Sequence, residues 1–357
     1  MKKLRVAIIG QGRSGRDIHG RFYRSENNHV VDVAVVVEKD PDRRERALQE
    51  YPGCEVLDDY TKLFGRTDID LVVNSSYSQM HYAITKDLLE HKLNVVVEKP
   101  FGRNYYECCD LMETAKRNNA VLAVFQQSNL APIYLDTKAF IESGKLGEIQ
   151  QISIRYNSLS RRWDWQTLQC KCAGGIYNTG PHPIGFALGF LGFDDNAKVA
   201  FSKLSNCLAS GDSDDYAKVI ISAPGKPVVD IEISNIDAYN DHLIRIQGSK
   251  GTYQCNGGGW KAKYIVDGEN PERPVIMASL KDENGNPMYC REKLITHEEE
   301  DTFNGSPFDV GTRRFYEMMH AHIFEGKPMV VTPEMAAKVI GIIETVHAQN
   351  PLPVKFQ

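Results

Sequence analysis

The sequence lacks any apolar run that approaches the roughly 20 residues needed to cross a lipid bilayer. It also lacks an excess of basic residues, since 42 Lys and Arg stand against 47 Asp and Glu, for a net charge of −5. A nucleic-acid binder presents a basic face to phosphates, so this balance argues against that class of protein. We therefore expect neither a membrane nor a nucleic acid as a partner.

Cysteine pairs with metal-binding spacing are missing as well. Among the eight cysteines, no Cys-x-x-Cys pair is followed by a second pair at zinc-ribbon spacing. The basic start Met1–Arg5 leads into the short apolar stretch Val6–Ile9 and then into a glycine motif, unlike a signal peptide. These features predict reduced thiols, a cytoplasmic protein and no metal site.

The chain is long enough, at 357 residues, to form two domains. Its first third alternates Val- and Ile-rich runs with helical patterns such as Met80, Ile84 and Leu88. The predicted buried strands are Leu4–Ile9, Val30–Val37, Ile69–Asn74, Asn94–Glu98 and Val121–Phe125. This alternation predicts an α/β fold, with a doubly wound parallel sheet of the Rossmann type in residues 1–127.

After Phe125 the apolar residues alternate with polar ones, which indicates strands with one buried face. The alternating residues are Ile152, Ile154 and Tyr156 in one segment and Val229, Ile231 and Ile233 in another. Helices are predicted near Tyr134–Ser143, Phe315–Phe324 and Pro333–His347. The polar segments Lys281–Asn286 and Glu298–Asp301 are interpreted as solvated loops. We expect an α+β domain with a large, open, mostly antiparallel sheet in residues 128–357, joined to the first domain by a tight junction.

A glycine motif follows the first predicted strand. Gly10, Gly12 and Gly15, with Arg13 and Ser14 between them, fit the pattern G-x-G-x-x-G in the required position between a strand and a helix. The glycines permit a tight turn and let backbone amides approach a pyrophosphate. The motif predicts a dinucleotide site, and a glycine turn without a ligand is the alternative.

The second predicted strand ends at Glu38, where an acidic side chain binds the adenosine ribose hydroxyls in dinucleotide folds. A carboxylate there repels a 2′-phosphate, so the sequence favours NAD over NADP. The neighbouring Lys39 can neutralise a phosphate, and a solvated Glu38–Lys39 pair is the alternative interpretation.

Two further motifs carry candidate catalytic residues. Lys99, within Glu98-Lys99-Pro100, follows the strand at Asn94–Glu98, and ligands of doubly wound sheets bind at this edge. Asn178 and His182 lie four residues apart in Gly174–Pro183, at the predicted start of a helix. The helix N-terminus and a nearby ammonium both favour a neutral imidazole, which a general base requires. A surface lysine and a packing histidine are the alternatives.

These residues resemble the glucose–fructose oxidoreductase, inositol dehydrogenase and rhizopine-catabolism family, written Gfo/Idh/MocA, over nearly the whole chain. The motifs that carry the resemblance are the glycine motif, Asp70–His81, Glu98-Lys99-Pro100, Ile141–Gly144 with Gly147, Gly174–His182 and Val331–Glu334. The resemblance implies that Lys99 bridges the nicotinamide ribose and the reacting hydroxyl, and that His182 accepts the proton. It also implies a subunit interface on the second sheet, and hence a homo-oligomer. The cofactor contacts that it implies further are Ser75, Ser76, His81, Glu98, Lys99 and Gln127.

Two positions depart from many relatives. Asn178 stands where Asp is frequent, so proton removal rests on His182 and Asn178 orients the substrate. Asn129-Leu130 stands where Arg before Phe is frequent, which leaves the substrate open.

The segment Arg161–Gln166 holds residue types that grip sugars. Trp163 and Trp165 can stack on a ring, and Arg161 can bind hydroxyls. We expect these side chains to bind a pyranose together with Lys99, Asn178 and His182. Two tryptophans that only anchor a loop are the alternative.

The sequence thus predicts an NAD-dependent dehydrogenase of a ring secondary alcohol in a sugar, glycoside or inositol, at C3 of a glucose-type ring. Its activity is expected to rise with pH through the ionisation of His182. The alternatives are redox-neutral glycoside cleavage, a non-catalytic NAD-binding regulator and, more remotely, a lysine Schiff-base enzyme.

Overall fold

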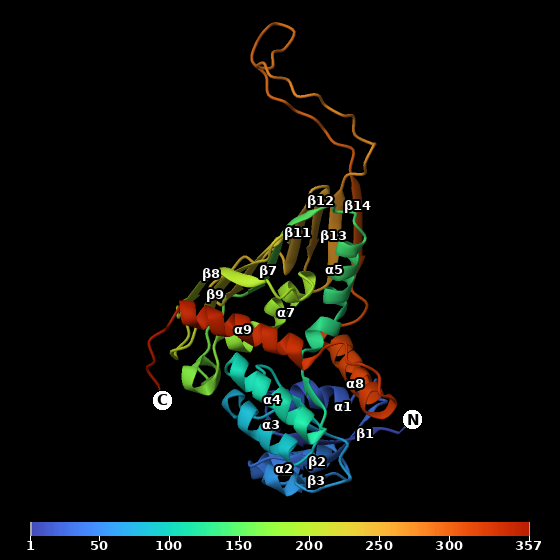
Figure 1. Ribbon diagram of the computed structural model, residues 1–357, viewed down its shortest axis with the longest axis vertical. Helices are drawn as coiled ribbons and strands as arrows, with labels where there is room; N and C mark the ends of the chain where they lie inside the picture. Colours follow the sequence, from blue (N-terminus) through green and yellow to red (C-terminus); the bar gives the residue numbers. More distant parts are fainter. Residues whose placement is uncertain (1, 357) are drawn as a thin grey trace.

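A computed structural model describes residues 2–356 of the chain, which form two sheets with helices around and between them (Figure 1). The first sheet has six parallel strands in the order β3-β2-β1-β4-β5-β6. Its strands are β1 (Leu4–Ile9), β2 (Val31–Val37), β3 (Glu55–Leu57), β4 (Leu71–Asn74), β5 (Val95–Val97) and β6 (Leu122–Val124). The helical segments that connect or follow them are η1 (Arg13–His19), α1 (Gly20–Tyr23), α2 (Pro41–Glu50), η2 (Tyr60–Leu63), η3 (Ser78–Met80), α3 (His81–Glu90), α4 (Tyr105–Asn118) and η4 (Gln127–Leu130).

The prediction of a doubly wound parallel sheet is confirmed. Helices on both faces bury β4, β5 and β6 completely and most of β1, which explains why their sequences are apolar without alternation. The sequence analysis missed β3, because its three residues Glu55–Leu57 are partly exposed at the sheet edge and give no apolar run.

The second sheet has eight strands in the order β14-β13-β12-β11-β7-β10-β9-β8, and only β7 and β10 run parallel. Its strands are β7 (Ile149–Asn157), β8 (Lys198–Ser205), β9 (Tyr216–Ser222), β10 (Val228–Ser234), β11 (Ile244–Gly248), β12 (Gly251–Cys255), β13 (Gly259–Tyr264) and β14 (His297–Thr302). The helical segments of this part are α5 (Pro132–Glu142), η5 (Trp165–Thr167), η6 (Gln169–Lys171), α6 (Gly175–Asn178), α7 (Pro181–Phe190), α8 (Pro307–Glu325) and α9 (Pro333–Gln349). The predicted open, mostly antiparallel sheet is therefore confirmed.

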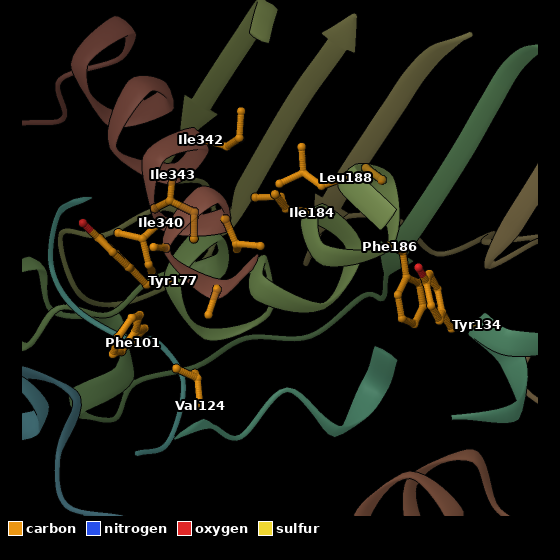
Figure 2. Close-up of a cluster of buried hydrophobic side chains, with 14 of the residues drawn as sticks. Phe101, Val124, Tyr134, Tyr177, Ile184, Phe186, Leu188, Ile340, Ile342 and Ile343 are labelled. Carbon is orange, nitrogen blue, oxygen red and sulfur yellow. The ribbon is translucent and has the colours of Figure 1, made fainter. Parts of the chain in front are cut away.

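One face of this sheet is covered and the other is open. Ile152 and Ile154 of β7 are buried with Ile184 of α7 and Ile340 of α9 in one apolar cluster, and Figure 2 shows part of the same cluster. On the opposite face, polar side chains such as Arg155 alternate with them, as the sequence predicted.

The acidic segment Glu298–Asp301 is not a loop, and that prediction was wrong. It forms most of the edge strand β14, which pairs antiparallel with β13. Lys263 lies opposite Glu298 and binds it at 2.7 Å, so cross-strand charge pairing stabilises a strand with few apolar residues. The local sequence does not reveal such a distant partner.

Helices α8 and α9 return to the first domain. Phe315, Tyr316 and Met319 of α8 are fully buried against β1 and β2, and α9 packs on α4. The junction is thus tight. Elements late in the chain complete the core of the first sheet, so the division into two domains at residue 127 stays a prediction.

Residues 265–296, called the arm below, extend away from the body between β13 and β14 (Figure 1). The predicted loop Lys281–Asn286 forms its exposed outer turn. The arm exposes apolar side chains: Val275 is 86% exposed, Met277 95% and Tyr289 83%. Among the helices of residues 2–356, none has the length and apolar character that a bilayer span requires.

Candidate functional site

A cleft of about 660 Å³ lies at the carboxyl edge of the first sheet and extends towards the second domain. The predicted site residues that line it are Gly10, Gly12, Arg13, Ser14, Glu38, Ser75, Ser76, His81, Glu98, Lys99, Trp165 and Asn178. Five further predicted residues lie outside its lining: Gly15, Gln127, Arg161, Trp163 and His182. The structure thus brings the two halves of the predicted site together from opposite domains.

The glycine turn has the shape that a dinucleotide requires. Gly10 has a φ of +90°, and a Cβ on Gly15 would lie 1.9 Å from the Gly10 carbonyl oxygen, so these two glycines shape the turn itself. A Cβ on Gly12 would meet only Arg43 Nη1, at 3.9 Å, so the backbone there faces open space. This open approach at the start of η1 fits a pyrophosphate.

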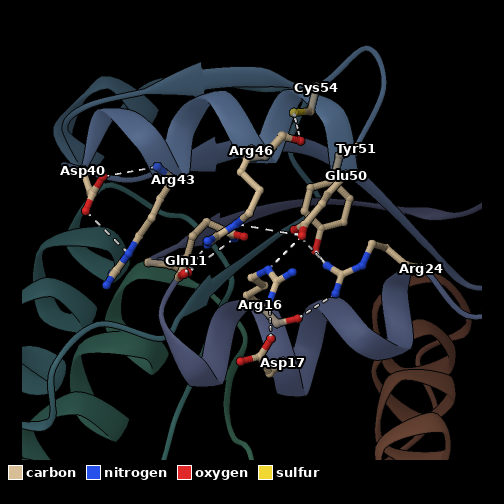
Figure 3. Close-up of polar contacts among 12 residues, drawn as sticks. Gln11, Arg16, Asp17, Arg24, Asp40, Arg43, Arg46, Glu50, Tyr51 and Cys54 are labelled. Carbon is tan, nitrogen blue, oxygen red and sulfur yellow. Dashed lines mark hydrogen bonds and ion pairs between the residues drawn. The ribbon is translucent and has the colours of Figure 1, made fainter.

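Ion pairs hold this turn against α2 (Figure 3). Arg16 Nε of η1 donates to Glu50 at 2.8 Å, and Arg46 donates to the Gln11 carbonyl at 3.1 Å. Asp40 caps α2 by accepting hydrogen bonds from the first helical amides.

Glu38 lies at the end of β2, as predicted, with its side chain turned back towards the glycine turn. Its Oε2 accepts a hydrogen bond from the Gln11 amide at 2.7 Å, and its Oε1 accepts one from the Asp40 amide at 3.1 Å. Lys39 and Arg43 line the cleft beside it. The pocket at this end therefore combines the fixed Glu38 carboxylate and those of Asp40 and Asp58 with two cations.

Glu98 belongs to a buried network that the sequence analysis missed. Its Oε1 lies 3.1 Å from Nε2 of His19, and the other nitrogen of that ring, Nδ1, lies 2.6 Å from the Tyr316 hydroxyl. Burial alone would raise the pKa of Glu98, but the His19 hydrogen bond and the Lys99 charge lower it below its ordinary value. Glu98 is thus held as a carboxylate directly beside Lys99.

Lys99 projects from the end of β5 into the cleft, where its Nζ donates a hydrogen bond to the Asn178 main-chain carbonyl at 2.6 Å. Burial lowers the pKa of this lysine, Glu98 opposes that effect, and the guanidinium groups of Arg13 and Arg162 add to it. The ammonium is therefore fixed between the two domains with a reduced hold on its proton.

His81, implied by the resemblance, is buried in the wall of the cleft. Its Nδ1 lies 2.8 Å from the Pro100 carbonyl, and its Nε2 lies 3.1 Å from the Ser76 carbonyl. Burial lowers its pKa. The ring thereby ties the Ser75–Ser76 turn to the segment that follows Lys99.

His182 lies in the first turn of α7, while Asn178 ends the separate helix α6. Burial and the charge of Lys99, against a smaller raising effect of Glu98, together lower the pKa of His182 to about 3. Its Nδ1 lies 3.0 Å from the Ser128 hydroxyl, a partner that the sequence analysis missed. The imidazole is neutral, as predicted, although burial is the main cause.

The two predicted tryptophans lie in different surroundings. Trp165 lines the cleft and packs edge to face on Tyr77, with ring centroids 5.0 Å apart. Trp163 is 76% exposed and, like Arg161, does not line the cleft. Arg162, the neighbour of Arg161, lines it instead and binds Asp164.

Family models match most of the chain. Residues 4–126 match the oxidoreductase family with an NAD-binding Rossmann fold, and residues 134–254 match the Gfo/Idh/MocA C-terminal domain. The solved structure of a putative oxidoreductase from Bacillus subtilis superimposes with a TM-score of 0.78 at 19% identity, covering 97% of this chain and 95% of that one.

Several curated relatives have named activities, and two of them are dehydrogenases of a polyol or a glycoside. The NADP-dependent scyllo-inositol 2-dehydrogenase of Bacillus subtilis is 23% identical, over 96% of this chain and 92% of its own length. The D-glucoside 3-dehydrogenase of Escherichia coli is 25% identical, over 69% of this chain and 70% of its own length. The fold, the cleft and both family matches lead to one conclusion: the chain belongs to the Gfo/Idh/MocA family of NAD-dependent oxidoreductases.

Proposed function

We propose that this protein is a dehydrogenase of a ring secondary alcohol in a sugar, glycoside or inositol, acting at C3 of a glucose-type ring. One observation supports it above all: Lys99, Asn178 and His182, from two domains, meet beside a cleft that begins at a dinucleotide turn. The similarity to a D-glucoside 3-dehydrogenase supports the choice of carbon.

Lys99, His182 and Asn178 have separate roles in the proposed reaction. Lys99 donates a hydrogen bond to the reacting hydroxyl and stabilises the negative charge that develops on its oxygen. When His182 carries its proton on Nδ1, facing Ser128, its Nε2 accepts the hydroxyl proton. When bound, the nicotinamide supplies the hydride acceptor, so the secondary alcohol becomes a ketone. The main-chain carbonyl of Asn178 accepts a hydrogen bond from Lys99 and thereby orients its ammonium group.

The substrate end of the cleft is aromatic and polar. Trp165, held by Tyr77, offers an aromatic edge to a sugar ring, and Arg162 offers hydrogen bonds to its hydroxyls. Trp163 and Arg161 remain proposed contacts, and they need the loop to close over the ring.

Product analysis tests the proposal. The protein is incubated with NAD and a panel of glucosides, free hexoses and inositols, and the products are identified by NMR. We expect a 3-keto sugar with one NADH per product. A product oxidised at C1, or no keto product from any pyranose, would overturn the substrate assignment. Cleavage of a glycoside without net NADH would instead establish redox-neutral chemistry.

We predict a preference for NAD over NADP that depends on Glu38. Glu38→Ala removes the charged acceptor and the repulsion of a 2′-phosphate, while Lys39 and Arg43 remain, so the ratio of the two dissociation constants should fall by about tenfold or more. Fluorescence titration with both reduced cofactors measures it. Glu45→Ala, an exposed change on α2, is the matched control. Equal affinity of the unaltered protein for both cofactors would contradict the prediction.

We also propose that the protein is cytoplasmic and forms a homo-oligomer through the second sheet. Buried free thiols such as Cys54, Cys108 and Cys255 suit a reducing compartment. The arm extends from the ends of the strands β13 and β14 of this sheet, and its exposed apolar side chains find burial against a second copy.

Deleting the arm should therefore lower the oligomeric state. Tyr264 and His297 are directly paired, so an Asn-Gly turn can replace residues 265–296 and close the hairpin between β13 and β14. Light scattering coupled to gel filtration should show a smaller assembly for this variant at equal concentration. An unchanged mass would contradict a role of the arm in assembly.

A further inference from the structure

Three buried carboxylates lie in the segment just before β9, outside the cleft lining. Asp212, Asp214 and Asp215 are 2%, 3% and 3% exposed. Asp212 accepts hydrogen bonds from the Gln169, Lys355 and Phe356 amides, and Asp215 accepts them from the amides of residues 207–209. These two carboxylates hold surface loops, whereas Asp214 binds the helix that carries Asn178.

Asp214 fits the start of α6 closely. Its Oδ2 accepts a hydrogen bond from the Ile176 amide at 2.8 Å, and its main-chain carbonyl accepts one from the Gly175 amide at 2.8 Å. Gly174 has a φ of +120°, and a Cβ there would lie 2.3 Å from Asp214 Oδ1. The glycine pair thus makes room for the carboxyl group and lets it reach the first turn.

The same helix holds the catalytic lysine. Helix α6 is a single turn, Gly175–Asn178, and its last residue donates its amide to the Gly174 carbonyl at 2.8 Å. The Asn178 carbonyl then accepts the Lys99 hydrogen bond at 2.6 Å. Because the helix is so short, a shift of its first turn moves the carbonyl at its end.

We propose that Asp214 is a positioning residue, which holds the first turn of α6 and thereby the Asn178 carbonyl that orients the Lys99 ammonium. Its effect on catalysis rests on the proposed dehydrogenase function, whereas the contact with α6 can be measured without a substrate.

The hydrogen bonds of Asp214 also make this contact sensitive to protonation. Burial raises its pKa to about 7, with a contribution from Asp215, against the Ile176 hydrogen bond. Its Oδ1 has no hydrogen-bond partner among the described residues. Asp212 is as deeply buried, but its pKa is lowered, because three external amides bind it.

The titratable groups on the elements around Asp214 are turned away or neutral. Tyr177 of α6 donates its hydroxyl to the Arg103 carbonyl, and Tyr216 of β9 lies with its hydroxyl 3.5 Å from Glu232. Burial raises the pKa of the Cys172 thiol to about 12, which keeps it neutral. On the side of β10, the side chain that lies beside Gly175 is Ile233, which carries no charge. The charged neighbour that acts on Asp214 is Asp215.

The direction in which pH changes the stability follows from the coupling between folding and the protonation of Asp214. The pKa of Asp214 in the folded protein, about 7, lies above its ordinary value of 3.8. The stability that this group contributes is therefore fully present below pH 3.8 and is lost as the pH rises through about 7. Above pH 7 a buried carboxylate with an unpartnered oxygen strains the turn that it holds.

The test compares Asp214→Asn with the unaltered protein. The amide keeps an acceptor for the Ile176 amide and cannot ionise. We expect the kcat of the unaltered protein to fall, relative to the variant, by about tenfold between pH 6 and pH 8, the change for one ionisation near 7. The affinity for NADH should change less than twofold. Asp212→Asn is the matched control, and it should keep the pH dependence of the unaltered protein.

Two measurements need no substrate and separate a failure of this proposal from a failure of the proposed function. In protein labelled with ¹⁵N-isoleucine, the Ile176 amide resonance should titrate near pH 7 and lose this step in Asp214→Asn. The unfolding temperature of the unaltered protein should fall relative to that of the variant over the same range. An Ile176 resonance that does not titrate, or a kcat profile that the variant shares, would overturn the proposal.

If Asp214→Asn does not fold, Gly175→Ala serves instead. Its Cβ would lie 3.0 Å from Asp214 Oδ2 and push the carboxyl group from its place. We expect a lower kcat at unchanged NADH affinity. Gly257→Ala, where a Cβ meets nothing within 4 Å, is its control. A kcat equal to that of the control would overturn the proposal.

Discussion

Lys99→Met should lose about a hundredfold or more in kcat while the affinity for NADH changes by only a few-fold. Methionine preserves the length and the apolar stem, but it removes the ammonium that donates to the Asn178 carbonyl and that, in the proposed reaction, faces the reacting oxygen. The loss of one electrostatic stabiliser in a water-poor site has this magnitude. Steady-state kinetics with the best substrate of the sugar panel and a NADH titration measure the two quantities.

The matched control for this change is Lys116→Met, on the exposed side of α4. It makes the same substitution away from the cleft and should leave kcat unchanged. If Lys99→Met turned over near the native rate, Lys99 would have no catalytic role. A loss of NADH affinity as large as the loss of kcat would instead make it a cofactor-binding residue.

The fold was predictable wherever a local pattern determines an element. Strands buried on both faces, such as β1, appear as continuous apolar runs, and strands of the half-covered sheet, such as β7, appear as alternation. The edge strand β14 was missed because its stability comes from Lys263 on a neighbouring strand. The return of α8 to the first sheet is a long-range contact that its sequence does not reveal either.

The candidate site was predictable to the extent that short motifs describe it. The glycine turn and Lys99 follow strands whose ends meet at one sheet edge, so their meeting could be inferred. Two partners outside these motifs lie far from them in the chain: His19 lowers the pKa of Glu98, and Asp214 accepts a hydrogen bond at the start of α6. The acidic run Asp212–Asp215 was visible in the sequence, but a buried and a solvated carboxylate look the same there.

The structure also changes the expected pH dependence. A single ionisation of His182 near neutral pH was expected to set the rising limb of activity. Because burial lowers the pKa of His182 to about 3, the ring is already neutral throughout the usual assay range, so the ionisation of His182 lies below that range. For a limb of opposite sign, in which activity falls as the pH rises through about 7, the proposed source is Asp214.

His182→Ala should nevertheless lower kcat by about a hundredfold or more, because a positioned general base contributes a factor of this order. The loss should be nearly the same at pH 6 and at pH 9, since the imidazole that it removes is neutral at both. His320→Gln is a suitable control for kcat: His320 is a buried histidine of α8, and its Nε2 lies 2.7 Å from the Lys2 carbonyl. This control should destabilise the fold but keep kcat within a few-fold. His347 is half-buried, with a pKa lowered to about 4 by burial, and it is compared for stability alone because it stacks on Tyr177 of α6.

His182 and His347 predict the same dependence of stability on pH, which is separate from the pH dependence of kcat. The pKa of each is lower in the folded chain than its ordinary value of 6.5, so the stability that each contributes is present above pH 6.5 and is lost as the pH falls towards 3 or 4. Between pH 8 and pH 4, the unfolding temperature should therefore fall less steeply in His182→Ala or His347→Gln than in the unaltered protein. A loss of kcat in His182→Ala that vanished at high pH would mean that a titrating group other than His182 removes the substrate proton.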